Sequence, residues 1–140
     1  MSSAALQNLI YALIQVAHNF GAAAVIGFAS YGLMRRVGQE LTQRTAFLGL
    51  TIAWAVQGAS GATFGITSLS FYGKLPDIHG VAVAAVSIKM ICVAIGFIVA
   101  FMGFRKSAGV EQRPRRSLLI ASFVLGATAL SAAAFLRWFS

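Results

Sequence analysis

Four long apolar runs dominate this sequence of 140 residues and restrict what it can fold into. They cover residues 9–34, 45–71, 78–104 and 117–139. A bilayer core about 30 Å thick is crossed by about 20 helical residues, so each run is long enough to span it. The runs are rich in alanine and leucine and lack the alternation typical of barrel strands. The sequence therefore predicts an all-α integral membrane protein, with residues 1–140 forming a single four-transmembrane-helix bundle.

The charged residues are too few to coat a soluble domain of this length. They make up 10% of the chain, whereas about 25% is usual. Eleven basic residues against three acidic ones give a net charge of +8, and most of the basic ones fall in two short clusters between the apolar runs. Such clusters are typical of segments that meet anionic lipid headgroups. We therefore expect the partner of this surface to be the lipid bilayer, and not nucleic acid.

The basic residues also predict how the helices are oriented. The segments between runs one and two and between runs three and four contain eight of them: Arg35, Arg36, Arg44, Arg105, Lys106, Arg113, Arg115 and Arg116. The segment between runs two and three contains only Lys74, beside Asp77. Because cytoplasmic loops are enriched in lysine and arginine, we expect both basic segments in the cytoplasm and both chain ends outside, an N-out/C-out arrangement. The expected location is a bacterial-type inner (cytoplasmic) membrane, crossed several times.

Two ionisable residues, His18 and Lys89, lie well inside the apolar runs. Each is about ten residues, or roughly 15 Å of helix, from the expected outer end of its run, so both lie at the same depth. Ionisable side chains in a membrane are energetically expensive and mark candidate functional sites. We therefore predict one site that contains both residues, with Lys89 facing the bundle interior or a water-filled cavity.

The second run contributes a polar face at the same level. Spacings of three and four place Gln57, Ser60, Thr63 and Thr67 on one side of a helix. The same run contains Gly61-Ala-Thr-Phe-Gly65, a small-xxx-small pattern that predicts a close helix crossing. The alternative is a slot for a flat cofactor, for which Gly21 in the first run also leaves space.

An imidazole in a membrane bundle is a common axial ligand of haem iron. We therefore predict a b-type haem with His18 as its iron ligand and Lys89 as a propionate partner or second ligand, lined by Gly21, Ser60 and Thr63. Covalent attachment is excluded because the chain has no Cys-x-x-Cys-His motif. His79 is the other candidate ligand. The soft ligands Met90 and Cys92 suit Cu(I), but they point to different sides of one helix.

The first run reads Val16-Ala-His18-Asn-Phe-Gly21 and the third Ser87-Ile-Lys89-Met-Ile-Cys-Val93, with Gly61 to Gly65 and Tyr72-Gly73 between them. Over these three runs the chain resembles the copper-resistance D family and the related HemJ-type protoporphyrinogen oxidases. In that group a first-helix histidine and a lysine early in a later helix recur, and HemJ-type members bind haem b. The resemblance implies these roles for His18 and Lys89.

The sequence thus predicts a small membrane subunit that binds haem b and transfers electrons, within a complex that contains other membrane subunits. It is expected to be an electron-transfer or accessory subunit rather than a catalyst by itself. One alternative is a structural or assembly subunit that has no cofactor and uses its glycine-rich faces for packing. Another is a small transporter or copper permease with Lys89 along its path.

Overall fold

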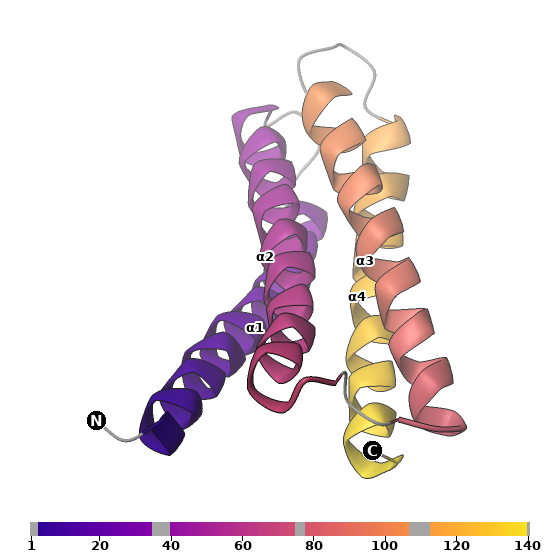
Figure 1. Cartoon of the computed structure of the whole chain (residues 1–140). Coiled ribbons are helices and arrows are strands. Elements are labelled where there is room, and N and C mark those ends of the chain that lie inside the picture. The colour runs from indigo at the N-terminus through magenta and orange to yellow at the C-terminus, as the bar shows by residue number, and fades with distance from the viewer. Residues whose placement is uncertain (1–2, 35–39, 75–77, 107–112, 140) are drawn as a thin grey trace.

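The computed structural model describes residues 3–34, 40–74, 78–106 and 113–139. Within these ranges the chain forms four α-helices and no strand: α1 (Ser3–Met34), α2 (Glu40–Tyr72), α3 (Val81–Lys106) and α4 (Arg113–Phe139). The helices alternate in direction, so α1 begins and α4 ends at the same end of the bundle (Figure 1). The prediction of an all-α chain is confirmed. Arg35, Arg36 and Asp77, used above to predict the orientation, lie outside the described residues.

Three of the described helices are long and apolar enough to cross a membrane. These are Ala4–Met34, Val81–Lys106 and Arg116–Phe139. Helix α2 is equally long, at 33 residues, but its glutamine, glycine and hydroxyl residues make it less apolar. The polar side chains Gln57, Ser60 and Thr67 of α2 are buried against the other helices, whereas Ile52 and Ile66 are exposed. Much of the outer surface of α2 is therefore apolar, and the exposed hydroxyls of Thr63 and Ser70 donate to carbonyls of the same helix.

Each helix packs against two others, in the closed order α1, α2, α3, α4 and back to α1. The core lies in the half of the bundle where α1 ends and α2 begins, and its largest buried side chains are Phe47, Leu50, Trp54 and Leu119. The first half of α1 diverges from α3 and α4 (Figure 1). In that half, Ile14 and His18 are the only described residues that are buried. His18 therefore lies where the tightly packed half of the bundle ends.

Two glycines of α3 leave space in which aromatic rings of α2 pack. A Cβ atom at Gly96 of α3 would lie 2.3 Å from Cε2 of Trp54, and one at Gly103 would lie 2.2 Å from Cε1 of Phe47. These two contacts fix how closely α2 and α3 approach. Gly61, in contrast, is exposed, and a Cβ atom there would have only Cε1 of His18 nearby, at 4.0 Å. The predicted close crossing at Gly61 is wrong, because the motif identifies small residues but not the helix face that meets a neighbour.

One buried hydroxyl offers a test of this packing. Ser122 of α4 is fully buried, and its Oγ atom has no hydrogen-bond partner among the described residues. A buried polar group without a partner costs about 1–3 kcal/mol of desolvation. We therefore expect Ser122→Ala to raise the unfolding temperature of the detergent-solubilised protein. Ser131→Ala is the control, since Ser131 on the same helix is exposed and donates to the carbonyl of Ala127. A larger loss of stability for Ser122→Ala than for the control would contradict this packing.

Candidate functional site

Three helices converge on the imidazole of His18, which lies in the middle of α1 and is 8% exposed. Its Nδ1 atom lies 2.7 Å from Oγ of Ser60 on α2. Its Nε2 atom lies 2.7 Å from Nζ of Lys89 on α3. The predictions that His18 and Lys89 lie at one depth and that Lys89 faces the bundle interior are therefore confirmed. Helices α1 and α3 are diagonal neighbours, so the half-buried Lys89 side chain reaches across the bundle to make this contact.

The hydrogen bonds assign the tautomer of His18. Ser60 has one hydroxyl proton, and its Oγ atom lies 2.6 Å from the carbonyl oxygen of Val56, to which it donates. Oγ of Ser60 must then accept from His18, so the ring carries its proton on Nδ1. The lone pair is left on Nε2, where it accepts a hydrogen bond from Nζ of Lys89. Lys89, His18 and Ser60 thus form one directional chain of hydrogen bonds that ends on the backbone of α2.

Gln57 fixes the backbone on which His18 sits. The Nε2 amide of Gln57 donates to the carbonyl oxygen of His18. This contact depends on Gly21, because a Cβ atom there would lie 2.7 Å from the Gln57 amide nitrogen. The space at Gly21 is therefore filled by Gln57, and the predicted opening for a ring beside Gly21 is not present. Gln57 was identified as part of a polar face, but sequence alone gave no reason to place it against His18.

Aromatic side chains cover the outer side of the imidazole. The ring of Phe64 on α2 meets that of His18 edge-on, at 5.9 Å between centroids and 81° between planes. Tyr11, two turns before His18 on α1, stacks on Phe64, with 6.2 Å between the ring centroids. Nearer the end of the bundle, the Gln7 amide donates to the hydroxyl of Tyr72. These contacts join α1 and α2 between the level of His18 and the end of the bundle at which α1 begins.

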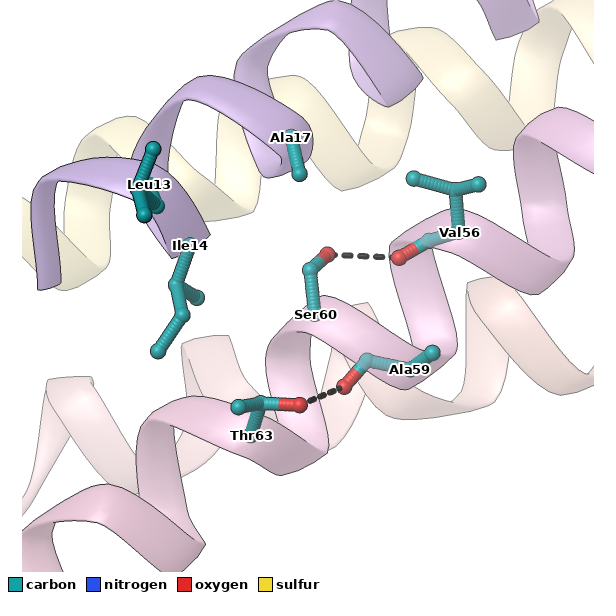
Figure 2. A pocket seen from close by; sticks show the side chains of 7 residues that line it. All are labelled: Leu13, Ile14, Ala17, Val56, Ala59, Ser60 and Thr63. Atoms are coloured by element: carbon teal, nitrogen blue, oxygen red, sulfur yellow. Dashed lines mark hydrogen bonds between the residues drawn. The ribbon is translucent and has the colours of Figure 1, made fainter. Parts of the chain in front are cut away.

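Thr63 is not part of this group. It is exposed, and its hydroxyl donates to the carbonyl of Ala59, 2.7 Å away. Thr63 lines an open pocket of about 350 Å³ between α1 and α2, together with Leu13, Ile14, Ala17, Val56, Ala59 and Ser60. Figure 2 shows the hydroxyl groups of Ser60 and Thr63 turned back onto their own helix, which leaves the pocket mostly apolar. Ser60 is the one residue that both lines this pocket and contacts His18.

The other predicted ligands do not join His18. His79 is exposed and lies ten residues before Lys89, roughly 15 Å along the helix axis, so it cannot share a metal with His18. Met90 is exposed whereas Cys92 is buried, which confirms that they point to different sides of α3. Among the described residues, no three His, Cys, Asp or Glu side chains lie close enough to hold a metal ion.

A haem needs less from the protein than a bare metal ion, since the porphyrin supplies four of its ligands. Metal-bound histidines usually donate the other ring N–H to a fixed acceptor, and Ser60 is such an acceptor for Nδ1 of His18. Nε2 then presents its lone pair to the bundle interior. In this structure the Nζ atom of Lys89 lies in front of that lone pair, 2.7 Å from Nε2. Two nitrogen ligands of one metal ion are about 4 Å apart, at about 2 Å per bond. Nε2 of His18 could therefore hold a haem iron only if Lys89 withdrew from it, and the space beside Gly21 is not open to the ring.

No known protein family, curated protein or solved structure matches this chain. The fold and the buried hydrogen-bonded chain therefore define its class: an all-helical protein with apolar helices of membrane-spanning length and an ionisable pair between them.

Proposed function

We propose that this chain is a small subunit of a bacterial-type inner membrane that binds a b-type haem through Nε2 of His18 and carries electrons beside partner membrane subunits. One observation supports this proposal above the others. Ser60 holds the Nδ1–H of a mid-helix imidazole and so directs the Nε2 lone pair into the bundle. A bound haem supplies a one-electron carrier. A reduced-minus-oxidised absorption spectrum of the purified protein tests the proposal.

The chain's own residues have separate tasks in this proposal. Ser60 keeps the imidazole in the tautomer whose Nε2 can bind iron, and Gln57 holds the His18 carbonyl and so the rotation of α1. Phe64 packs edge-on against the imidazole and Tyr11 stacks on Phe64, so that aromatic rings limit the approach of polar molecules from this direction. With a haem bound, Lys89 would turn from Nε2 toward a propionate while its stem stayed on α3. Because a cation near a haem favours the electron-rich reduced form, a charged Lys89 there would raise the reduction potential.

We further propose that all four helices span the bilayer, with the ends of the described chain outside. Helix α2 is included because Gln57, Ser60 and Thr67 are buried and large apolar side chains such as Ile52 and Ile66 face outward. Exposed large apolar side chains lie along every helix, among them Leu13, Ile52, Ile98 and Val124. A bilayer offers such a surface a matching environment, and the basic clusters favour the cytoplasm for the end at which α3 finishes.

This topology can be tested with single cysteines at two exposed positions, Lys74 and Arg116, in a Cys92→Ser background. In intact spheroplasts a membrane-impermeant maleimide is expected to label Lys74→Cys but not Arg116→Cys. Lysis of the spheroplasts should expose the second site. Equal labelling of both positions in intact spheroplasts would exclude the four-span arrangement, since α3 alone lies between the two residues in sequence and would place them on opposite sides of the membrane.

A structural or assembly subunit without a cofactor is the second candidate. The observation that favours it is that both ring nitrogens of His18 already have partners within the chain. In that case the Lys89–His18–Ser60 chain serves to tie α1, α2 and α3 together. The two candidates differ in whether the purified protein contains a tetrapyrrole.

A further inference from the structure

Exposed basic side chains from three helices gather where α3 ends and α4 begins. They are Arg44 of α2, Arg105 and Lys106 at the end of α3, and Arg116 in α4. We call these four residues the basic end. In the sequence, residues 35–44 and 105–116 together contain eight basic residues and two acidic ones, Glu40 and Glu111. The charge at this end is therefore strongly positive, and an anion is the complementary ligand.

Arg44 is held in place by an aromatic ring. Its guanidinium carbon lies 5.5 Å from the centroid of the Phe104 ring on α3, within the range of a cation–π contact. Stacking uses the face of the guanidinium, while its N–H donors lie in its plane and can form paired hydrogen bonds with phosphate oxygens. The contact therefore keeps Arg44 at the seam between α2 and α3, and Arg105 follows Phe104 directly in the sequence of α3.

Apolar side chains lie directly beside these cations. Leu48, Phe101 and Met102 are exposed and lie four residues, or one helical turn, from Arg44, Arg105 and Lys106 respectively. Each basic residue therefore has an exposed apolar residue one turn deeper on the same helix face. A phospholipid has the same order of chemistry, with a phosphate above and acyl chains below. A free phosphate ion matches only the first half of this pattern.

We propose that the seam between α2 and α3 at the basic end binds the headgroup phosphate of an anionic phospholipid, with Arg44 as its main ligand and Arg105 beside it. Acyl chains of the lipid lie along Leu48 and Phe101. The site depends on the contact between Arg44 and Phe104 and is independent of any cofactor at His18. Failure of the haem proposal therefore leaves this site unaffected.

The test is native mass spectrometry of the full chain in detergent, titrated with phosphatidylglycerol or with phosphatidylcholine of the same acyl chains. The parent protein is expected to bind phosphatidylglycerol more tightly. Arg44→Gln should weaken that binding about fivefold, since one basic side chain near anionic lipid contributes about 1 kcal/mol. Arg137→Gln is the matched control, because Arg137 is an exposed arginine at the opposite end of the bundle. It should leave phosphatidylglycerol binding unchanged.

A second variant separates a built site from general charge attraction. Phe104→Leu keeps every charge but removes the ring that holds Arg44, and is expected to weaken phosphatidylglycerol binding in the same direction. Phe135→Leu controls for loss of an aromatic side chain, because Phe135 is exposed near the end of α4, at the opposite end of the bundle, and should leave phosphatidylglycerol binding unchanged. Equal weakening by Arg44→Gln and Arg137→Gln, or equal affinity of the parent for both lipids, would overturn the proposal. So would displacement of phosphatidylglycerol by millimolar inorganic phosphate, which would identify the seam as a site for a free anion.

Discussion

Replacing Gly96 by leucine is expected to prevent the chain from forming a folded bundle. Even a Cβ atom at this position would lie 2.3 Å from the Trp54 ring, and leucine adds three further carbons. Trp54 is 1% exposed in the core, so it has no open side to move toward. Overpacking of a core typically costs about 1–3 kcal/mol of folding free energy and occasionally more. Here α2 and α3 would have to move apart from each other to make room for the leucine. The measurement is the yield of monodisperse protein from membranes by size-exclusion chromatography.

Gly27→Leu is the matched control for this substitution. Gly27 also lies within a long helix, but it is exposed and a Cβ atom there would meet nothing within 4 Å. This variant should be recovered at the level of the parent protein. Equal recovery of Gly96→Leu and Gly27→Leu would show that Trp54 does not pack against Gly96, and that α2 and α3 meet differently.

His18→Ala is expected to remove the absorption bands of a b-type haem while the protein stays in the membrane. The substitution deletes Nε2, the one ring nitrogen whose lone pair faces the bundle interior, and no other described histidine reaches that level. Lys89→Met should instead keep the haem and lower its reduction potential by roughly 50–100 mV, because a nearby cation is removed. Redox titration of the purified variants measures both effects.

His79→Ala controls for the general effect of removing a histidine. His79 is exposed at the end of the bundle, so this variant should keep both the haem bands and the potential of the parent. If His79→Ala lost the haem and His18→Ala kept it, the iron ligand would be His79 and our proposal would be wrong. Identical elution volumes of the three variants establish that each is folded.

Depth along the helices was the part of the site that the sequence predicted well. Counting from the ends of the apolar runs placed His18, Lys89 and Ser60 at one level, and the three side chains are in contact. Depth can be predicted because the helical rise is constant. The rotation of a helix is harder to predict, since the runs that form α2 and α3 have little overall polar contrast around their circumference. Thr63 was therefore placed with Ser60, three residues away, although it faces outward.

The packing contacts illustrate a second limit. Gly61 and Gly96 are both glycines in long apolar helices, yet Gly61 is exposed whereas Gly96 receives the Trp54 ring. What distinguishes them is the neighbouring helix, which becomes known only when the order of helices around the bundle is known. The same holds for Gly21, whose missing side chain admits the Gln57 amide. Local motifs predicted that close contacts exist, and the tertiary structure determines where.

The measurement that tests the central claim most directly is the absorption spectrum of the parent protein, purified from cells supplied with haem. The spectrum is recorded oxidised and again after reduction with dithionite. Our proposal predicts the sharp visible bands of a reduced b-type haem, at about one haem per chain, as expected for the single mid-span imidazole ligand. A protein that is folded and monodisperse but contains no tetrapyrrole would contradict the proposal. The Lys89–His18–Ser60 chain would then be a structural tie between three helices.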